Sequence, residues 1–341
     1  MTISTHSDAR KTPAVTVVIA AYNASRYIAQ ALDSVQAQTF SNYEVIVVND
    51  GSSDSDELEQ ILRSHPLPII YLSQENKGVS AARNAAIRIA KGEFYAQLDS
   101  DDQWTPDYLE VQLQILRDNP DVVLVYPNAT IIADAAEDER EFMEVSPSEG
   151  EVNFESLVRQ QCTVMTCVTA RMSAIREAGM FDETLRSCED FDLWLRIAKN
   201  VGRIAYHRQP LALYRRHEGS LSSDRVWMTR CLLDVFEKSA RTLTLTPRET
   251  EVLHEETTRS RAVLCLFEGK RALNTGDAGT ALARFSEAHA ELRTPKLALV
   301  VFFLRHSPHL VIWTYALRER LVQKQPHHQL SGIDQPRAAS D

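Results

Sequence analysis

The sequence has little of what nucleic-acid-binding or membrane-spanning proteins need. Its 341 residues include 37 Lys and Arg against 47 Asp and Glu, a formal net charge of −10. Such an acidic chain is a poor candidate for binding a DNA or RNA backbone. It also repels anionic substrates unless a metal ion or a local basic cluster compensates. No apolar stretch of about 18 residues or more is present, so no transmembrane helix is expected.

Cysteine is also scarce, and its placement indicates no disulfide framework. The five cysteines are scattered, odd in number and free of CxxC pairs: Cys162, Cys167, Cys188, Cys231 and Cys265. This pattern favours a reduced, cytosolic compartment. The first 14 residues contain no apolar core of a signal peptide. We therefore expect a cytoplasmic protein.

The most apolar segment, 297–318, is divided into two short pieces by Arg305, His306 and Pro308. A pair of core helices is the favoured interpretation. The alternative is peripheral membrane contact through 297–317, with a helix lying on the inner face of the membrane.

Several common active-site motifs are missing. No GxGxxG follows the first predicted strand, and no GxxxxGK[ST], GxSxG, HExxH or Cys/His zinc spacing occurs. Dinucleotide-binding, P-loop, hydrolase-triad and zinc sites are therefore not supported. What remains is carboxylates, and their hard oxygen atoms suit Mg²⁺ or Mn²⁺.

The N-terminal part alternates between strands and helices. Four apolar strands are predicted, at 15–20, 45–48, 69–72 and 94–98. The helices between them are predicted from residue 25, in the segment "DSDELEQILRS" and over 78–92, with Gly92 as a C-terminal cap. This order predicts an α/β fold with a mostly parallel sheet and helices on both faces. In such sheets ligands bind at the carboxyl ends of the strands.

The chain is predicted to have four parts. Residues 1–12 and 326–341 are expected to be disordered tails, 13–222 an α/β domain, and 223–325 an all-helical region. Within that region, 266–292 resembles one tetratricopeptide hairpin, with Gly269, Ala281, Phe285 and Ala288 at that repeat's spacing. Because such arrays usually need three or more copies, a structural hairpin is favoured over a docking module.

Aspartates that end two predicted strands are expected at the binding edge of the sheet. Asp99, Asp101 and Asp102 follow the fourth strand, and an extended chain would project Asp99 and Asp101 to the same side. The plain interpretation is a turn that caps the next element; the position favours a divalent ion held by Asp101 with Asp99 nearby. Asp50 ends the second strand, either in a turn or as the acceptor for a ligand ring N–H. Tyr22 could stack on that ring.

Two further segments carry candidate chemistry. Glu189 and Asp190 begin a predicted helix, either compensating its dipole or supplying a general base. Arg215, Arg216 and His217 form a rare basic cluster. It is either a solvated turn or a diphosphate site with His217 as a metal ligand.

Taken in order, these segments resemble the bacterial, inverting family 2 glycosyltransferases of GT-A fold. The likeness covers roughly residues 13–222, and six stretches carry it: "VVIAAYNASRYIAQALDSVQAQTF", "EVIVVNDGSSD", "NKGVSAARNAAI", "LDSDDQWTPDYLE", "CEDFDLWLRIA" and "YRRHEGSLS". The resemblance implies a nucleotide-sugar donor, most often a UDP-sugar, and a divalent metal. It also implies an acceptor in glycan or polysaccharide synthesis, which could be lipid-linked.

The resemblance also assigns roles to residues. Tyr22 and Asp50 would contact the nucleobase, and Arg83 would lie near the donor. Asp99 and Asp101 would form the DxD motif, with Asp101 as metal ligand, and Asp190 would be the catalytic base. His217 matches a position where some members contact metal or diphosphate. Ala20 is counted with the donor contacts, although members often have Thr or Ser there, so this chain lacks that side-chain contact to the base.

Two other functions compete with this interpretation. One is a non-catalytic nucleotide-sugar-binding or scaffold protein with a helical docking module, which would not need to keep Asp50, Asp99, Asp101 and Asp190 together. The other is a nucleotidyltransferase, which usually has a Gly-rich, basic first loop; "AAYNASRY" is neither.

Overall fold

The computed structural model describes residues 3–4, 12–133, 140–217 and 224–323. The chain divides into two compact units, residues 1–217 and 218–341. The predicted tail 326–341 lies outside the described residues, as does most of 1–12.

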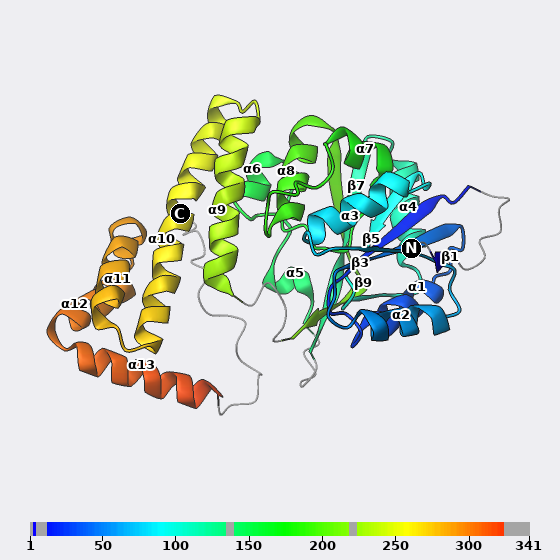
Figure 1. Cartoon of the computed structure of the whole chain (residues 1–341). Helices are drawn as coiled ribbons and strands as arrows, with labels where there is room; N and C mark the ends of the chain where they lie inside the picture. The colour runs from blue at the N-terminus through cyan, green and yellow to red at the C-terminus, as the bar shows by residue number, and fades with distance from the viewer. Residues whose placement is uncertain (1–2, 5–11, 134–139, 218–223, 324–341) are drawn as a thin grey trace. The chain divides into compact units, whose positions relative to one another are not determined.

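The first unit is built on a nine-stranded sheet of order β1-β4-β3-β2-β5-β8-β7-β9-β6 (Figure 1). Its strands are β1 (Ile3–Ser4), β2 (Val15–Ala21), β3 (Tyr43–Asp50), β4 (Ile69–Gln74), β5 (Phe94–Gln97), β6 (Gln103–Trp104), β7 (Val122–Ala133), β8 (Thr169–Arg171) and β9 (Arg203–Arg216). The central strands β4, β3, β2 and β5 are parallel, as predicted. The chain runs outward from β2 through β3 to β4 and returns to β5 on the other side of β2, which makes a topological switch point at the carboxyl ends.

Helices cover both faces of this sheet. They are α1 (Ile28–Gln36), α2 (Ser55–Ser64), α3 (Val79–Ile89), α4 (Tyr108–Asp118), α5 (Phe142–Val145), α6 (Phe154–Val158), α7 (Met172–Glu177) and α8 (Glu189–Asn200). In Figure 1, α1 and α2 lie on one side of β2–β4 and α3 lies on the other. The strand residues between these layers are buried because they face helices on both sides; Val17, Ile46 and Val47 are nearly inaccessible to solvent.

The antiparallel half of the sheet was not predicted. β7 pairs in parallel with β9 and antiparallel with β8, and β8 pairs antiparallel with β5. Arg215 and Arg216 of the basic cluster therefore end a 14-residue strand, and His217 follows it directly. The long-range pairing of β9 with β7 places the cluster there.

The second unit is all-helical, as predicted. Its helices are α9 (Arg225–Thr242), α10 (Pro247–Asn274), α11 (Ala278–Leu292), α12 (Pro295–His306) and α13 (Pro308–Gln323). The long helix α10 packs against both α9 and α11 (Figure 1). Gly269 on α10 lets the ring of Phe285 approach so closely that an added Cβ would lie 3.0 Å from it. Phe285, Ala281 and Ala288 are buried in the core of this hairpin.

Gly92 does not cap α3, so that expectation was wrong. The helix ends earlier, with Ala90 at its C-cap. Gly92 instead lies against β2, where its N–H donates to Thr16 Oγ1 at 2.9 Å. A Cβ at this position would lie 2.6 Å from the carbonyl carbon of Val15. Close backbone approach, not helix termination, is the reason for glycine here.

We expect Gly92→Ala to lower the free energy of unfolding by about 1–3 kcal/mol, because the new methyl group meets backbone atoms that cannot move aside. Chemical denaturation would measure it. The matched control is Lys91→Ala at the exposed neighbouring position, expected to stay within about 0.5 kcal/mol of the parent. Equal effects of the two substitutions would contradict this reason for the glycine.

Candidate functional site

The candidate residues gather at the carboxyl edge of the sheet. Asp50 is the last residue of β3, Asp99 and Asp101 follow β5, and His217 follows β9. The start of α8 brings Glu189 and Asp190. Four separate segments thus contribute to one edge, the one at which ligands bind in open parallel sheets.

The three aspartates after β5 occupy a turn, so the chain is not extended here, which was the condition for Asp99 and Asp101 to project to the same side. The backbone N–H of Asp102 donates to the carbonyl oxygen of Asp99 at 3.1 Å. The turn directs Asp102 into the interior, where it is 2% exposed and its Oδ1 accepts from the backbone N–H of Arg215 at 2.8 Å. Burial and the charges of Asp99 and Asp101 raise the pKa of the Asp102 carboxyl well above its usual range. Asp102 therefore ties the β5 turn to β9, a role that sequence reasoning missed.

Asp101 and His217 meet across this junction. Asp101 Oδ2 lies 3.0 Å from His217 Nε2, and both side chains are partly exposed. Burial and the charge of Asp99 raise the pKa of Asp101, while the contact with His217 opposes the rise. The His217 ring also packs near that of Tyr27, with centroids 5.3 Å apart. The structure thus brings together the two residues predicted to hold a metal.

Arg215 is directed toward protein groups. Its Nε donates to the carbonyl oxygen of Asp101 at 2.9 Å, and its Nη2 donates to Gln30 Oε1 at 2.7 Å. The guanidinium also lies over the Tyr27 ring, 4.7 Å from its centroid. Arg215 therefore stabilises the Asp101 turn by binding its backbone carbonyl oxygen. Residues 218–222 of the same motif lie outside the described residues.

Arg83 links the two acidic motifs. It projects from α3 and is 4% exposed. Nη2 donates to Asp99 Oδ1 at 2.8 Å and Nη1 donates to Glu189 Oε1 at 2.6 Å. Burial lowers the pKa of the Arg83 guanidinium, but the charges of Asp99 and Glu189 more than offset this and raise it above its ordinary value. Arg83 stays cationic and holds the DxD turn beside the start of α8.

Glu189 and Asp190 occupy the first turn of α8 and have different surroundings. Glu189 is buried against Arg83, whereas Asp190 is less enclosed and accepts from the backbone N–H of Phe191 at 2.6 Å. Burial and the charge of Glu189 raise the pKa of Asp190 to about 7, although Arg83 opposes the rise. A carboxylate of this basicity can take a proton near neutral pH. The helix begins after Cys188, a non-glycine residue in the left-handed region with φ 58°.

Asp50 is buried and well hydrogen-bonded. Its Oδ1 accepts from Gln74 Nε2 at 2.7 Å and from the backbone N–H of Lys77 at 2.9 Å, and its Oδ2 accepts from the backbone N–H of Gly78 at 2.8 Å. A carboxylate offers about four lone-pair sites, so one acceptor position remains on Oδ2. Tyr22, just past β2, is 56% exposed. Asp50 thus orders the entry to α3, while Tyr22 presents a free ring face.

The acidic turn suits a divalent cation. Asp99, Asp101 and Asp102 fall within four residues. Burial and the charge of Asp99 raise the pKa values of both Asp101 and Asp102. A cation would relieve this repulsion. Among the described residues no cluster of three or more His, Cys, Asp or Glu side chains is placed to hold a metal. The predicted ligands Asp101 and His217 form a pair rather than such a cluster.

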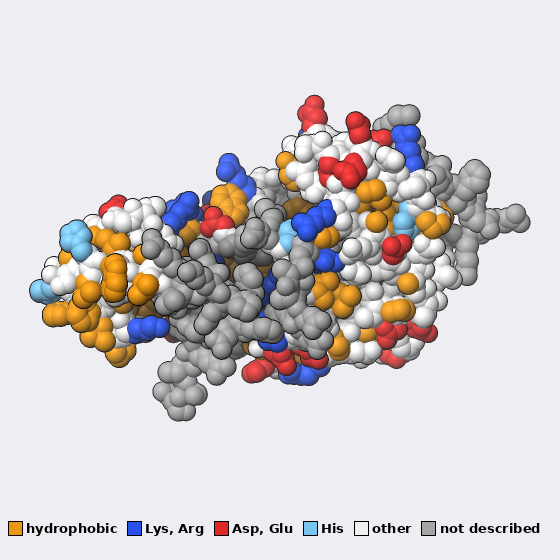
Figure 2. Space-filling model, turned by 90° about the horizontal axis from the view of Figure 1, so that it is seen from below, with side chains coloured by type: hydrophobic (Ala, Val, Ile, Leu, Met, Phe, Trp, Pro, Cys, Tyr) orange, Lys and Arg blue, Asp and Glu red, His pale blue; other side chains and the backbone are white. Residues whose placement is uncertain are grey.

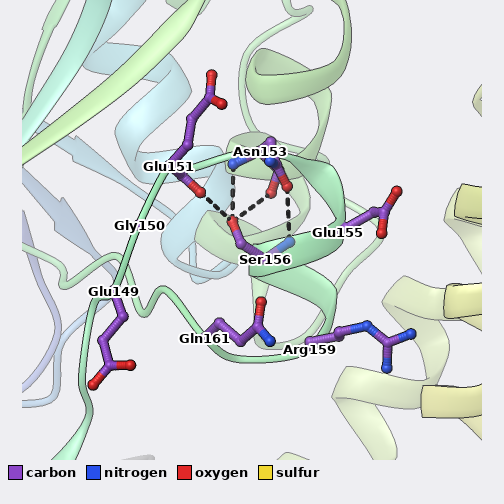
Figure 3. Close-up of a pocket in the computed structure, with 8 residues that line it drawn as sticks. All are labelled: Glu149, Gly150, Glu151, Asn153, Glu155, Ser156, Arg159 and Gln161. Carbon is purple, nitrogen blue, oxygen red and sulfur yellow. Dashed lines mark hydrogen bonds between the residues drawn. The ribbon is translucent and has the colours of Figure 1, made fainter.

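A separate hollow of 470 Å³ lies beside α6 (Figure 3). Its lining includes Glu149, Glu151 and Glu155, whose carboxylates point in different directions, while Asn153 and Ser156 exchange hydrogen bonds at the start of α6. None of the predicted site residues lines it. It contributes nothing to the site at the sheet edge.

Residues 16–179 match the model of the family described as "Glycosyl transferase family 2". The match includes Asp50, Arg83, Asp99 and Asp101 and stops before Asp190 and His217. A Rickettsia bellii protein described as an uncharacterized glycosyltransferase is 33% identical over 211 residues, 60% of this chain and 30% of that protein. The chondroitin synthase of Escherichia coli is 31% identical over 210 residues, 58% of this chain and 29% of that protein. The chain spans less than two thirds of the length of these curated relatives.

Two solved structures have a similar fold. Residues 1–349 of Staphylococcus aureus TarS, in complex with UDP-GlcNAc, superpose with a TM-score of 0.60 at 18% identity, covering 92% of this chain and 93% of that one. The mannosyltransferase PcManGT from Pyrobaculum calidifontis, in complex with GDP-Man and Mn²⁺, gives a TM-score of 0.58 at 19% identity, covering 93% and 89%. At this identity the likeness shows the fold alone.

The family match, the curated relatives and the shared fold agree with the carboxylate-lined edge of the sheet. Through its N-terminal unit, this chain belongs to glycosyl transferase family 2 and has the GT-A fold.

Proposed function

We propose that this chain is a metal-dependent, inverting glycosyltransferase. It moves a sugar, of the hexose type, from a nucleotide-diphosphate sugar to an acceptor hydroxyl on a growing or lipid-linked glycan, as in cell-surface polysaccharide synthesis. The observation that carries the proposal is the Arg83 bridge between Asp99 and Glu189, next to Asp190, whose pKa is raised to about 7. A scaffold protein has no need for a general base at that place.

The donor is expected to bind across the switch point of the sheet. Tyr22 would stack on the base, Ala20 would lie beneath it, and the open lone pair of Asp50 would accept a ring N–H. A UDP-sugar is favoured, and UDP-GlcNAc in the TarS complex and GDP-Man in the PcManGT complex support a nucleotide sugar in this fold. Asp101 and His217 would hold Mg²⁺ or Mn²⁺, and an imidazole ligand suits Mn²⁺ better. When bound, the ion neutralises charge on the leaving diphosphate.

The chain's own groups account for the proton transfer. Asp190 accepts the proton of the acceptor hydroxyl while that oxygen attacks the anomeric carbon. The bond from that carbon to the diphosphate oxygen breaks, and its electron pair leaves with the nucleotide. Because attack is opposite to departure, a single displacement inverts the anomeric centre. Arg83 fixes the Asp99 turn and Glu189, so that Asp190 is positioned before substrate arrives.

Replacing the base tests the chemistry directly. Asp190→Asn should lower kcat by about 10²–10⁴-fold because the amide cannot take the proton. Binding of UDP with Mn²⁺, measured by calorimetry, should be little changed. Retained turnover in this variant would contradict the role of Asp190, and a product with the donor's anomeric configuration, read by NMR, would contradict inversion. Donor binding without turnover in the parent protein would favour the scaffold function.

The pH dependence should report the same carboxylate. Since the pKa of Asp190 is raised to about 7, the base is protonated and inactive below that pH. We expect kcat/KM to fall about tenfold per pH unit on the acid side of pH 7 and to level off above it. A profile with its acid limb near the usual pKa of aspartate, about 4, would contradict this assignment.

Metal dependence is tested by calorimetry of UDP with Mn²⁺ and with EDTA. Asp101→Asn should weaken Mn²⁺-dependent UDP binding by at least about tenfold, the loss expected even for groups around a metal's ligands. Asp118→Asn is the matched control, because it makes the same chemical change on the exposed surface of α4. Equal binding of UDP in EDTA and in Mn²⁺ would rule out the metal site.

A further inference from the structure

Helix α12 is apolar on two opposite sides. Leu297, Val301 and Leu304 are buried in the core of the second unit, as a pair of core helices would require. Leu299, Phe302 and Phe303 are 58%, 54% and 44% exposed. A helix that is hydrophobic all round is ordinarily covered on every side. Packing in the core explains why one side of α12 is apolar, but it does not explain the apolar residues on the other side.

Helix α13 repeats this arrangement. Val311, Ile312 and Tyr315 pack against the core. Leu310, Trp313 and Leu317, at helical spacing i, i+3 and i+7, are exposed by 51%, 61% and 42%. Figure 2 shows hydrophobic side chains gathered at this end of the second unit, with histidine side chains at the edge. We call the six exposed residues of α12 and α13 the apolar face: Leu299, Phe302, Phe303, Leu310, Trp313 and Leu317.

The segment that carries the apolar face has charged residues of one sign only. No Asp or Glu occurs between Glu291 and Glu319, although the whole chain carries a net charge of −10. The same segment contains Lys296 and Arg305, together with His306 and His309. An acidic protein thus has a local basic, aromatic-rich surface, and Trp and Phe beside basic residues are typical of helices that lie in the headgroup region of a bilayer.

We infer that α12 and α13 bind an anionic lipid surface. The helices would lie in the plane of the interface, with the apolar face in the outer part of the bilayer and the basic residues at the phosphate groups. Among the residues described, no helix is both long and apolar enough to cross a membrane. Attachment would therefore be peripheral. This goes beyond the proposed transfer reaction and does not depend on it.

A second copy of the chain fits the apolar face less well. In a two-fold dimer the same patch meets itself, so Lys296 and Arg305 would face their own equivalents without an acidic residue of the segment to compensate. The C-terminal residues 324–341 fit poorly as well, since Leu330 and Ile333 are their only large aliphatic residues. Charge complementarity favours acidic lipid headgroups.

The test is sedimentation of the full chain with lipid vesicles. It should bind vesicles of phosphatidylcholine with about a third phosphatidylglycerol, bind pure phosphatidylcholine less, and lose affinity as salt is raised. Phe302→Ala/Trp313→Ala should lower the affinity for the anionic vesicles by about tenfold or more. Arg305→Glu should lower it on anionic vesicles with little effect on neutral ones.

The matched control is Ile89→Ala, which removes an exposed aliphatic side chain from α3 in the other unit and should leave vesicle binding unchanged. Thermal unfolding of each variant should confirm that the fold persists, because the substituted positions are exposed. Failure of the parent chain to bind anionic vesicles at low salt would overturn the proposal, and so would equal binding by the double variant. A dimer in light scattering that dissociates in the double variant, without vesicle binding, would identify the face as an interface between copies.

Discussion

The buried guanidinium of Arg83 is the contact on which the arrangement of the site depends. It stands between Asp99 and Glu189, and thereby joins a turn after β5 to a helix about 90 residues later in the chain. Removing one partner of a buried ion pair commonly costs about 3–5 kcal/mol, because the other charge is left without compensation. The same charge opposes the rise in the pKa of Asp190 that burial and the charge of Glu189 cause. Arg83 therefore helps to fix the position of the proposed base, whereas burial and the charge of Glu189 account for its basicity.

A second constraint is the concentration of negative charge in the turn after β5. Asp99, Asp101 and Asp102 could not share so small a space in a buried site without separate partners. Arg83 donates a hydrogen bond to Asp99, His217 contacts Asp101, and the backbone N–H of Arg215 donates to Asp102. These partners come from α3 and from β9, so the turn is held from both sides.

The two units carry different kinds of surface. The first buries most of its hydrophobic side chains between sheet and helices and has its acidic residues at the strand ends. The second buries only part of its apolar surface, since α12 and α13 use one side each to close the hairpin of α10 and α11. The first unit thus has the candidate site residues at the edge of its sheet, and the second unit has a basic, aromatic face. A glycosyltransferase whose acceptor is attached to lipid would use both.

The sequence by itself determined the parallel strands, the order of the helices and the identity of the groups at the strand ends, because apolar periodicity and strand-end aspartates are local signals. It also placed Asp101 and His217 together through the resemblance to a family. Only the tertiary structure decided which contacts connect these groups. The sequence could not reveal that Asp102 turns inward to bind β9, that Arg83 bridges two carboxylates, or that Gly92 makes room for β2. Each of these depends on the pairing of segments far apart in the chain, and no local pattern encodes which backbone or charge will lie opposite.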